Sequence, residues 1–148
     1  MIRISAPIKS FVALCCVLGG TACGGGAAPA DVQSFPVESL LSLTSDSGQL
    51  SISVRSAPAQ PPTRGNVSLE LSISDAITGE AQSGLELKAV PWMPAMGHGT
   101  SIQPTISEVS PGKYELRNLV LFMPGTWQIR TELAGLAIDH VTPTFEIR

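Results

Sequence analysis

An unbroken alternation of apolar and polar residues, VSLELSIS at residues 67–74, constrains the fold of this chain more than any other feature. A period of two places alternate side chains on opposite faces of an extended strand, so this segment predicts a strand that is buried on one side. Shorter versions of the pattern occur at residues 50–55, 85–89, 113–118, 127–133 and 145–148. No segment after residue 23 has a convincing helical period, and the sequence therefore predicts an all-β domain.

Turn-forming residues separate these segments. Pro111 and Gly112 lie between two strand-like runs and predict a tight hairpin, with the first strand at residues 106–109. The proline-rich stretch APAQPP cannot join a strand ladder and is predicted to be a loop. About seven short antiparallel strands with this spacing predict an immunoglobulin-like β-sandwich, and a small closed barrel is the alternative fold. Trp127 lies on the apolar face of its strand, so we expect it in the core.

The first 22 residues have the features of a signal peptide. Arg3 and Lys9 precede an apolar run that is too short for a transmembrane helix, and small residues follow it. The ending GTAC resembles a bacterial lipobox, which implies that Cys23 becomes the lipidated first residue of the mature protein. A plain secretory signal cleaved near Ala22 is the alternative, and it would leave Cys23 as an odd free thiol.

Residues 23–47 are predicted to form a flexible tether between the lipidated cysteine and the domain. The stretch GGGAAPA has no periodicity and almost no apolar bulk, which is typical of a flexible spacer. Residues 37–43 fit either a helical turn or a first strand, and we assign them to the tether. The sandwich is then residues 48–148, the length of one domain. All three cysteines precede residue 24, so this domain holds together without a disulfide.

The segment PWMPAMGHG brings three soft metal ligands together in a glycine- and proline-rich loop, namely Met93, Met96 and His98. Thioethers and imidazole suit Cu(I) better than magnesium or calcium. Because Met96 and His98 are separated by one residue, both side chains would point the same way in an extended loop. Met93 would need a bend to join them, and Met123, in the segment FMPGTW, must come from a neighbouring strand. The alternative is a methionine loop that packs in the core and docks a partner protein without metal.

Composition and motifs argue against several other functions. The net charge is −3, only 14% of residues are charged and no basic cluster occurs, so nucleic acid is not an expected partner. The chain contains no nucleophile elbow, phosphate-binding loop, HExxH sequence or zinc-finger spacing. Asp139 and His140 are adjacent, but we expect them to be solvated on an edge strand. These observations predict a protein that is not an enzyme.

The methionine segments resemble the YtkA-like domain of bacterial exported proteins, which is related to the FixH-like group. Its pattern is Met-Pro-x-Met-Gly-His, then Gly-x-Tyr, then Met-x-Gly-x-Trp, and the chain has these at residues 93–98, 112–114 and 123–127. The resemblance covers about residues 69–133 and implies a small immunoglobulin-like sandwich with no known enzymatic activity. Related domains occur beside metal-efflux adaptors and copper-oxidase assembly proteins. The resemblance therefore implies copper(I) as the ligand and a copper-handling or efflux protein as the partner of a lipid-anchored protein of the cell envelope.

Overall fold

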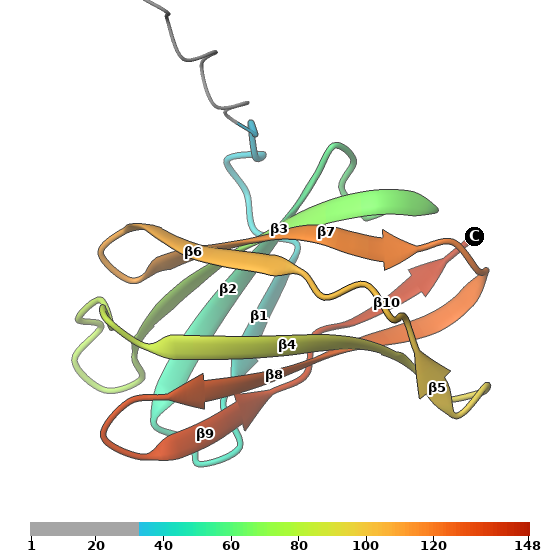
Figure 1. Ribbon diagram of the computed structural model, residues 1–148. Helices are drawn as coiled ribbons and strands as arrows, with labels where there is room; N and C mark the ends of the chain where they lie inside the picture. The colour runs from blue at the N-terminus through green and yellow to red at the C-terminus, as the bar shows by residue number, and fades with distance from the viewer. Residues whose placement is uncertain (1–32) are drawn as a thin grey trace, which may run out of the picture. The chain divides into compact units, whose positions relative to one another are not determined.

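The computed structural model describes residues 33–148, which form ten β-strands and no helix (Figure 1). The strands are β1 Leu41–Thr44, β2 Leu50–Ala57, β3 Gly65–Asp75, β4 Glu86–Met93, β5 His98–Gly99, β6 Thr105–Ser110, β7 Lys113–Leu121, β8 Gly125–Ala134, β9 Ile138–Val141 and β10 Thr144–Ile147. The predicted signal peptide at residues 1–22, the proposed lipidation site at Cys23 and the tether as far as residue 32 lie outside the described residues.

The strands form two antiparallel sheets that pack as two layers (Figure 1). Sheet A has the order β1-β2-β3-β7-β6, and sheet B has the order β10-β8-β4-β5, with β9 also paired to β8. Apart from β1, this is the A-B-E-D and G-F-C-C′ arrangement of immunoglobulin-like domains. The predicted all-β sandwich is therefore confirmed. The seven strands expected from the alternating pattern correspond to β2, β3, β4, β6, β7, β8 and β10, and the structure adds the short strands β1, β5 and β9.

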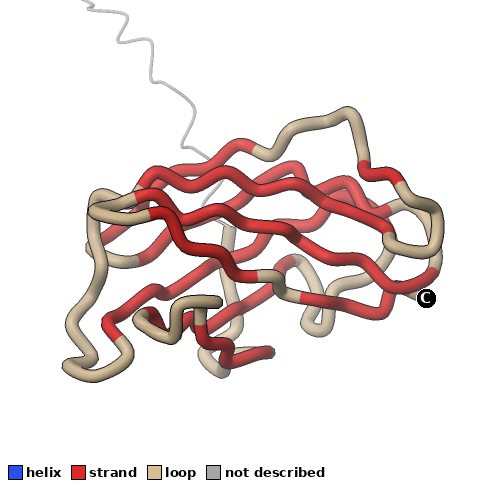
Figure 2. Tube along the Cα trace, turned by 90° about the horizontal axis from the view of Figure 1, so that it is seen from below, coloured by secondary structure: helices blue, strands red, loops and turns tan. Residues whose placement is uncertain are grey.

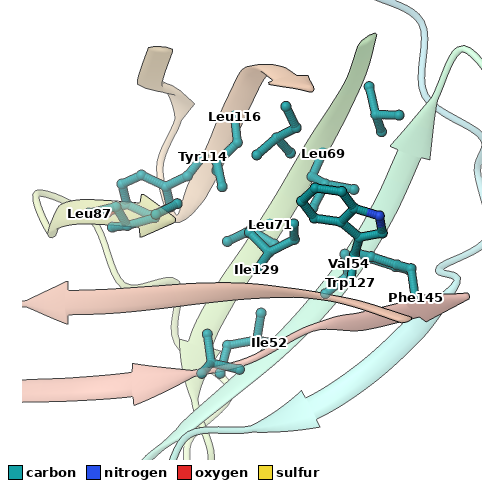
Figure 3. Close-up of a cluster of buried hydrophobic side chains, with 14 of the residues drawn as sticks. Ile52, Val54, Leu69, Leu71, Leu87, Tyr114, Leu116, Trp127, Ile129 and Phe145 are labelled. Carbon is teal, nitrogen blue, oxygen red and sulfur yellow. The ribbon is translucent and has the colours of Figure 1, made fainter. Parts of the chain in front are cut away.

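The apolar positions of the alternating segments form one core between the sheets. Figure 3 shows the side chains of Val54, Leu69 and Trp127 within this cluster. Trp127 is 2% exposed, which confirms that it is a core residue. Its indole N–H donates a hydrogen bond to the Met123 carbonyl at 2.9 Å, so the polar atom of this large side chain is satisfied although it is buried.

The first strand of the sandwich lies within the segment that is predicted to be tether. β1 pairs with β2 so that Leu41 is opposite Val54, and the N–H of Leu40 donates to the Val54 carbonyl at 2.8 Å. The predicted tether, residues 23–47, is therefore too long at its C-terminal end. β1 has only four residues, and as an edge strand it buries Leu41 and Leu43 only in part, so its alternation is too brief to distinguish a strand from a linker.

Hydrogen bonds connect the two sheets at the end of the sandwich where the β1–β2 turn lies. Asp139, in β9 of sheet B, accepts hydrogen bonds from the N–H and the hydroxyl of Ser47 in that turn of sheet A. The N–H of Asp46 donates to the His140 carbonyl at 2.9 Å. Asp139 is 9% exposed, so the expectation that it would be solvated is wrong, although it does lie on an edge strand. Its partner is 92 positions away in the sequence, which local patterning cannot reveal.

Within residues 33–148 there is no helix that could span a membrane.

Candidate metal site

A tight turn between β4 and β5 positions three of the four candidate metal ligands. The N–H groups of Met96 and Gly97 both donate to the Met93 carbonyl at 3.1 Å, and Gly97 has the left-handed φ of 68° that such a turn requires. The turn returns the chain so that His98 is opposite Met93 and Gly99 is opposite Trp92. The chain is therefore not extended between Met93 and His98. The expectation that the side chains of Met96 and His98 point the same way assumed an extended loop, and it loses its basis here.

The pair that the hairpin does bring together is Met93 and His98. Residues directly opposite each other on antiparallel strands have Cβ atoms about 4.5–5.5 Å apart and point to the same face of the sheet. Met93 is 5% exposed and belongs to the core, so its face is the inner one, and the exposed His98 lies beside it at the rim. Met96 is at the tip of the turn and is 56% exposed.

Two glycines allow this close packing. A Cβ atom on Gly99 would lie 2.2 Å from the carbonyl oxygen of Pro91, so β5 can approach β4 only with glycine at this position. A Cβ atom on Gly125 would lie 2.7 Å from the methyl carbon of Met93. The thioether of Met93 therefore ends over the backbone at the start of β8. Our sequence reasoning missed both positions, although a glycine inside a strand often marks a close approach of this kind.

Met123 reaches the same end of the sandwich from the β7–β8 connection. It is partly buried against the core that contains Met93, and its carbonyl accepts the indole N–H of Trp127. Met123 precedes Gly125 by two residues, and the methyl group of Met93, on the neighbouring strand β4, lies next to Gly125. We call this end of the molecule, with Met93, Met96, His98, Met123 and Trp127, the methionine end.

The contact of the His98 ring determines which of its nitrogens is available. Nδ1 lies 3.1 Å from the Gly99 carbonyl oxygen, which can only accept a hydrogen bond. In the neutral ring this contact favours the tautomer with its proton on Nδ1, which would leave the lone pair of Nε2 for a ligand. This is the division of roles found in metal-binding histidines, in which the second ring N–H donates to a carbonyl or carboxylate.

The two tryptophans do not share an environment. Trp127 is in the core, whereas Trp92 is opposite Gln128 on the outer face of sheet B, with the Arg130 guanidinium 4.5 Å from its ring centroid. Only Trp127 therefore belongs to the core at the methionine end. The second histidine, His140, is opposite Glu132 on β8, away from this site.

The donor set of the methionine end is soft. No group of three or more histidine, cysteine, aspartate or glutamate side chains that could hold a metal ion occurs within residues 33–148. The candidate ligands here are thioethers and one imidazole, which fit Cu(I) and suit neither magnesium nor calcium.

The fold and this hairpin define a small antiparallel β-sandwich that carries methionine and histidine side chains at one end. The model of the family described as YtkA-like matches residues 45–132, more than half of the chain, and the chain belongs to this family. The match starts earlier than the segment that carries the resemblance, about residues 69–133, and includes β2 and all of β3. No curated protein and no solved structure matches the chain.

Proposed function

We propose that this chain is a non-enzymatic, exported lipoprotein that binds Cu(I) at the methionine end of its YtkA-like domain. The observation that supports this most directly is the β4–β5 register, which sets His98 opposite Met93 on the inner face of the sheet. Met123 lies in the β7–β8 connection, two residues before the glycine, Gly125, that the methyl group of Met93 approaches. Cu(I) is soft and accepts few ligands, so two thioethers and one imidazole are sufficient to hold it.

Each proposed ligand has a distinct part. Nε2 of His98 is the nitrogen donor at the rim, and the sulfurs of Met93 and Met123 are the donors on the core side. Met96 is the most exposed of these methionines, so it is the donor that an approaching protein meets first. Because Met93 is 5% exposed, binding requires a small outward movement of the hairpin. The two residues of β5 give that hairpin little resistance to such a movement.

The proposal also includes a membrane anchor and a partner protein. Cys23 follows the signal-like segment and precedes a Gly/Ala spacer, so we propose that it carries the lipid that holds the domain at the cell envelope. The partner that the family resemblance implies is a copper-handling or efflux protein. Cys23→Ser should release the protein from membranes into the soluble fraction. A variant that still fractionates with membranes would show that the anchor is elsewhere.

The decisive experiment is a Cu(I) titration under reducing conditions against a chromophoric chelator. The chain should carry Cys15→Ser, Cys16→Ser and Cys23→Ser, because a free thiolate would compete for the metal. Met93→Leu, Met123→Leu and His98→Gln each remove one donor while keeping most of the side-chain volume. We expect each to weaken Cu(I) affinity about tenfold or more, and Met96→Leu, the matched control at the tip, to weaken it least. Equal affinities for all five proteins would exclude this site.

The pH dependence separates an imidazole ligand from thioethers alone. Protons compete with metal for a ring nitrogen and not for a thioether. Affinity of the wild type should therefore fall as the solution is acidified from neutral pH, and that of His98→Gln should change little.

One observation favours a second function, a protein-interaction module without metal. Met93 is packed into the core, while Met96 and Phe122, the residue before Met123, are 56% and 61% exposed. Exposed apolar side chains around one end of a domain are typical of docking surfaces. Absence of Cu(I) binding by the wild-type chain would leave this function as the better explanation of the methionine end.

A further inference from the structure

Most of the outer edge of β4 has no neighbouring strand. On one side β4 pairs with β8 from Glu86 to Trp92. On its other side β5 pairs only with Trp92 and Met93, which leaves residues 86–90 uncovered among the described strands. Figure 1 shows β5 at one end of β4, with the rest of that strand lying along the margin of its layer.

Sheet A extends beyond this margin. β4 is in contact with β7, and β6 continues sheet A on the far side of β7. Figure 1 shows the crossover from β5 to β6 passing next to this margin, and Figure 2 shows the two layers of strands from below. A groove of about 390 Å³ lies below this overhang and is lined by Leu87, Ala89, Pro104, Ile106 and their neighbours. The groove therefore lies where one more strand of sheet B would continue the second layer.

The edge of sheet A at β6 and the edge of sheet B at β9 and β10 are both interrupted, whereas residues 86–90 of β4 pair with β8 in an unbroken register. The β6–β7 register shifts between Glu108 and Ser110, and the Glu108 carboxylate accepts hydrogen bonds from the N–H groups of Gly84 and Gly112. On the opposite side of sheet B, the edge is interrupted between β9 and β10, where Pro143 lies. Bulges and prolines on edge strands prevent the addition of further strands. The β4–β8 register runs from Glu86 to Trp92 without a shift, and the proline of this strand, Pro91, lies beyond the uncovered residues 86–90, next to the end that β5 covers.

We propose that the β4 edge binds an extended segment of another protein, which adds to sheet B as an antiparallel strand. Main-chain hydrogen bonds to an exposed sheet edge supply affinity, and alternate side-chain positions supply specificity. On β4 the side chains of Leu87 and Ala89 point inward, and those of Glu86 and Lys88 point outward. The matching segment has apolar residues that enter the groove, an acidic residue opposite Lys88 and a basic residue opposite Glu86. The Lys88 side chain pairs with Glu132 and is still 65% exposed, so its ammonium remains accessible.

A second copy of this chain does not fit the same edge. Two β4 strands paired antiparallel would place both copies of sheet A on the same side of the joined sheet. The β6 of each copy would then occupy the space of the β7 of the other, since β6 overhangs the position beyond β4. A single strand avoids this overlap, and so the occupant is a peptide segment and not another sandwich.

A synthetic peptide of the sequence Thr-Val-Glu-Val-Lys-Val-Thr tests the proposal with the intact chain carrying Cys23→Ser. In antiparallel alignment its Glu is opposite Lys88 and its Lys is opposite Glu86. Binding should shift the amide NMR resonances of residues 86–90 and slow their hydrogen exchange. The control peptide, in which Glu and Lys are exchanged, should bind about five- to tenfold more weakly, because two attractive cross-strand pairs become repulsive.

A charge reversal on the protein and a change to the peptide backbone complete the test. Lys88→Glu should change the preferred peptide residue opposite position 88 from acidic to basic, so that a peptide with Lys at both charged positions binds best. A melting curve near that of the wild type shows that the variant is folded. A peptide N-methylated on alternate residues on its β4-facing side should lose binding in the wild type. Absence of binding, shifts confined to residues outside β4 and its groove, or equal binding of the N-methylated peptide would each overturn the proposal.

Discussion

The two ends of the sandwich are held by different kinds of interaction. At the end with the β1–β2 turn, which we call the clamp end, Asp139 joins the two sheets through the N–H and hydroxyl of Ser47. Tyr114 adds a second link at this end, since its hydroxyl donates to the Gln82 carbonyl and accepts the N–H of Leu85 on the crossover between the sheets. At the methionine end, thioethers and the Trp127 ring pack at the rim of the core, and Met96 extends into solvent.

The difference shows how a small domain without a disulfide can keep one end adaptable. Hydrogen bonds to a buried carboxylate and a buried phenol demand defined geometry, so they fix the distance between the sheets. Thioethers tolerate rearrangement because methionine is unbranched and flexible. The clamp end therefore fixes the spacing of the two sheets, and the methionine side chains at the rim of the other end have more freedom to rearrange. Three predictions test this comparison.

The largest effect is expected from Trp127→Ala at the methionine end. Replacing a buried tryptophan by alanine costs about 3–5 kcal/mol, a large part of the roughly 5–15 kcal/mol that holds a typical domain together. The variant should be unfolded or barely folded in a urea titration followed by circular dichroism. Trp127→Phe, which keeps most of the ring and loses only the N–H bond to Met123, should be clearly less destabilised. A melting curve of Trp127→Ala close to that of the wild type would show that the core does not depend on this end.

A smaller, pH-dependent effect is expected from Asp139 at the clamp end. Burial of the carboxyl opposes ionisation, but hydrogen bonds from Ser45, Ser47 and the His140 N–H outweigh it and lower the pKa of Asp139 from 3.8 to about 2. The native state thus favours the ionised form, and the stabilisation is complete above pH 4 and is lost as the pH falls from about 4 towards 2.

Asp139→Ala should lower the free energy of unfolding at neutral pH by about 1–3 kcal/mol, because the donors of Ser47 lose their acceptor. It should also flatten the pH dependence between pH 4 and 2. Urea titrations at several pH values measure both effects. The control is Asp46→Asn, which changes a neighbouring exposed carboxylate. An unchanged pH dependence in Asp139→Ala would remove this carboxylate from the clamp.

The smallest effect is expected from Met96→Ala at the tip of the hairpin. An exposed side chain away from the core changes stability by no more than about 0.5 kcal/mol. Met93→Ala, three positions earlier and buried, should cost about 2–5 kcal/mol, the usual range for a buried methionine. Urea titrations of the two variants compare the inner and outer parts of the same turn. Similar losses in both would mean that Met96 also packs in the folded protein.

The sequence predicted the strands in which apolar and polar residues alternate over enough positions to show a period of two. Residues 67–74 alternate over eight positions and form the centre of β3, and Trp127 is buried as its strand pattern required. The strands β1, β5 and β9 were missed for physical reasons. β5 has only two residues, too few for any period, and β9 buries the polar Asp139, which reverses the expected pattern.

The candidate site was predicted less completely than the fold. The four ligand types and their two segments are evident in the sequence, but their grouping depends on the turn at Gly97 and the β4–β5 register. The turn moves Met96 to the tip and pairs Met93 with His98. The role of Met123 depends on β8 lying beside β4, a contact between strands that are distant in the sequence.

The bond between Ser47 and Asp139 also limits when the domain can fold during synthesis. These two residues are 92 positions apart, and β3 pairs with β7 across more than 40 residues. The first turn and β3 therefore cannot make all their contacts until much later parts of the chain have been synthesised. Non-local pairings of this kind form slowly, because the entropy cost of closing a long loop precedes the stabilising contacts. A nascent chain that has not yet released residue 139 from the ribosome therefore lacks the interaction that joins its first turn to sheet B. We therefore expect the fold to be completed only after β9 has been synthesised.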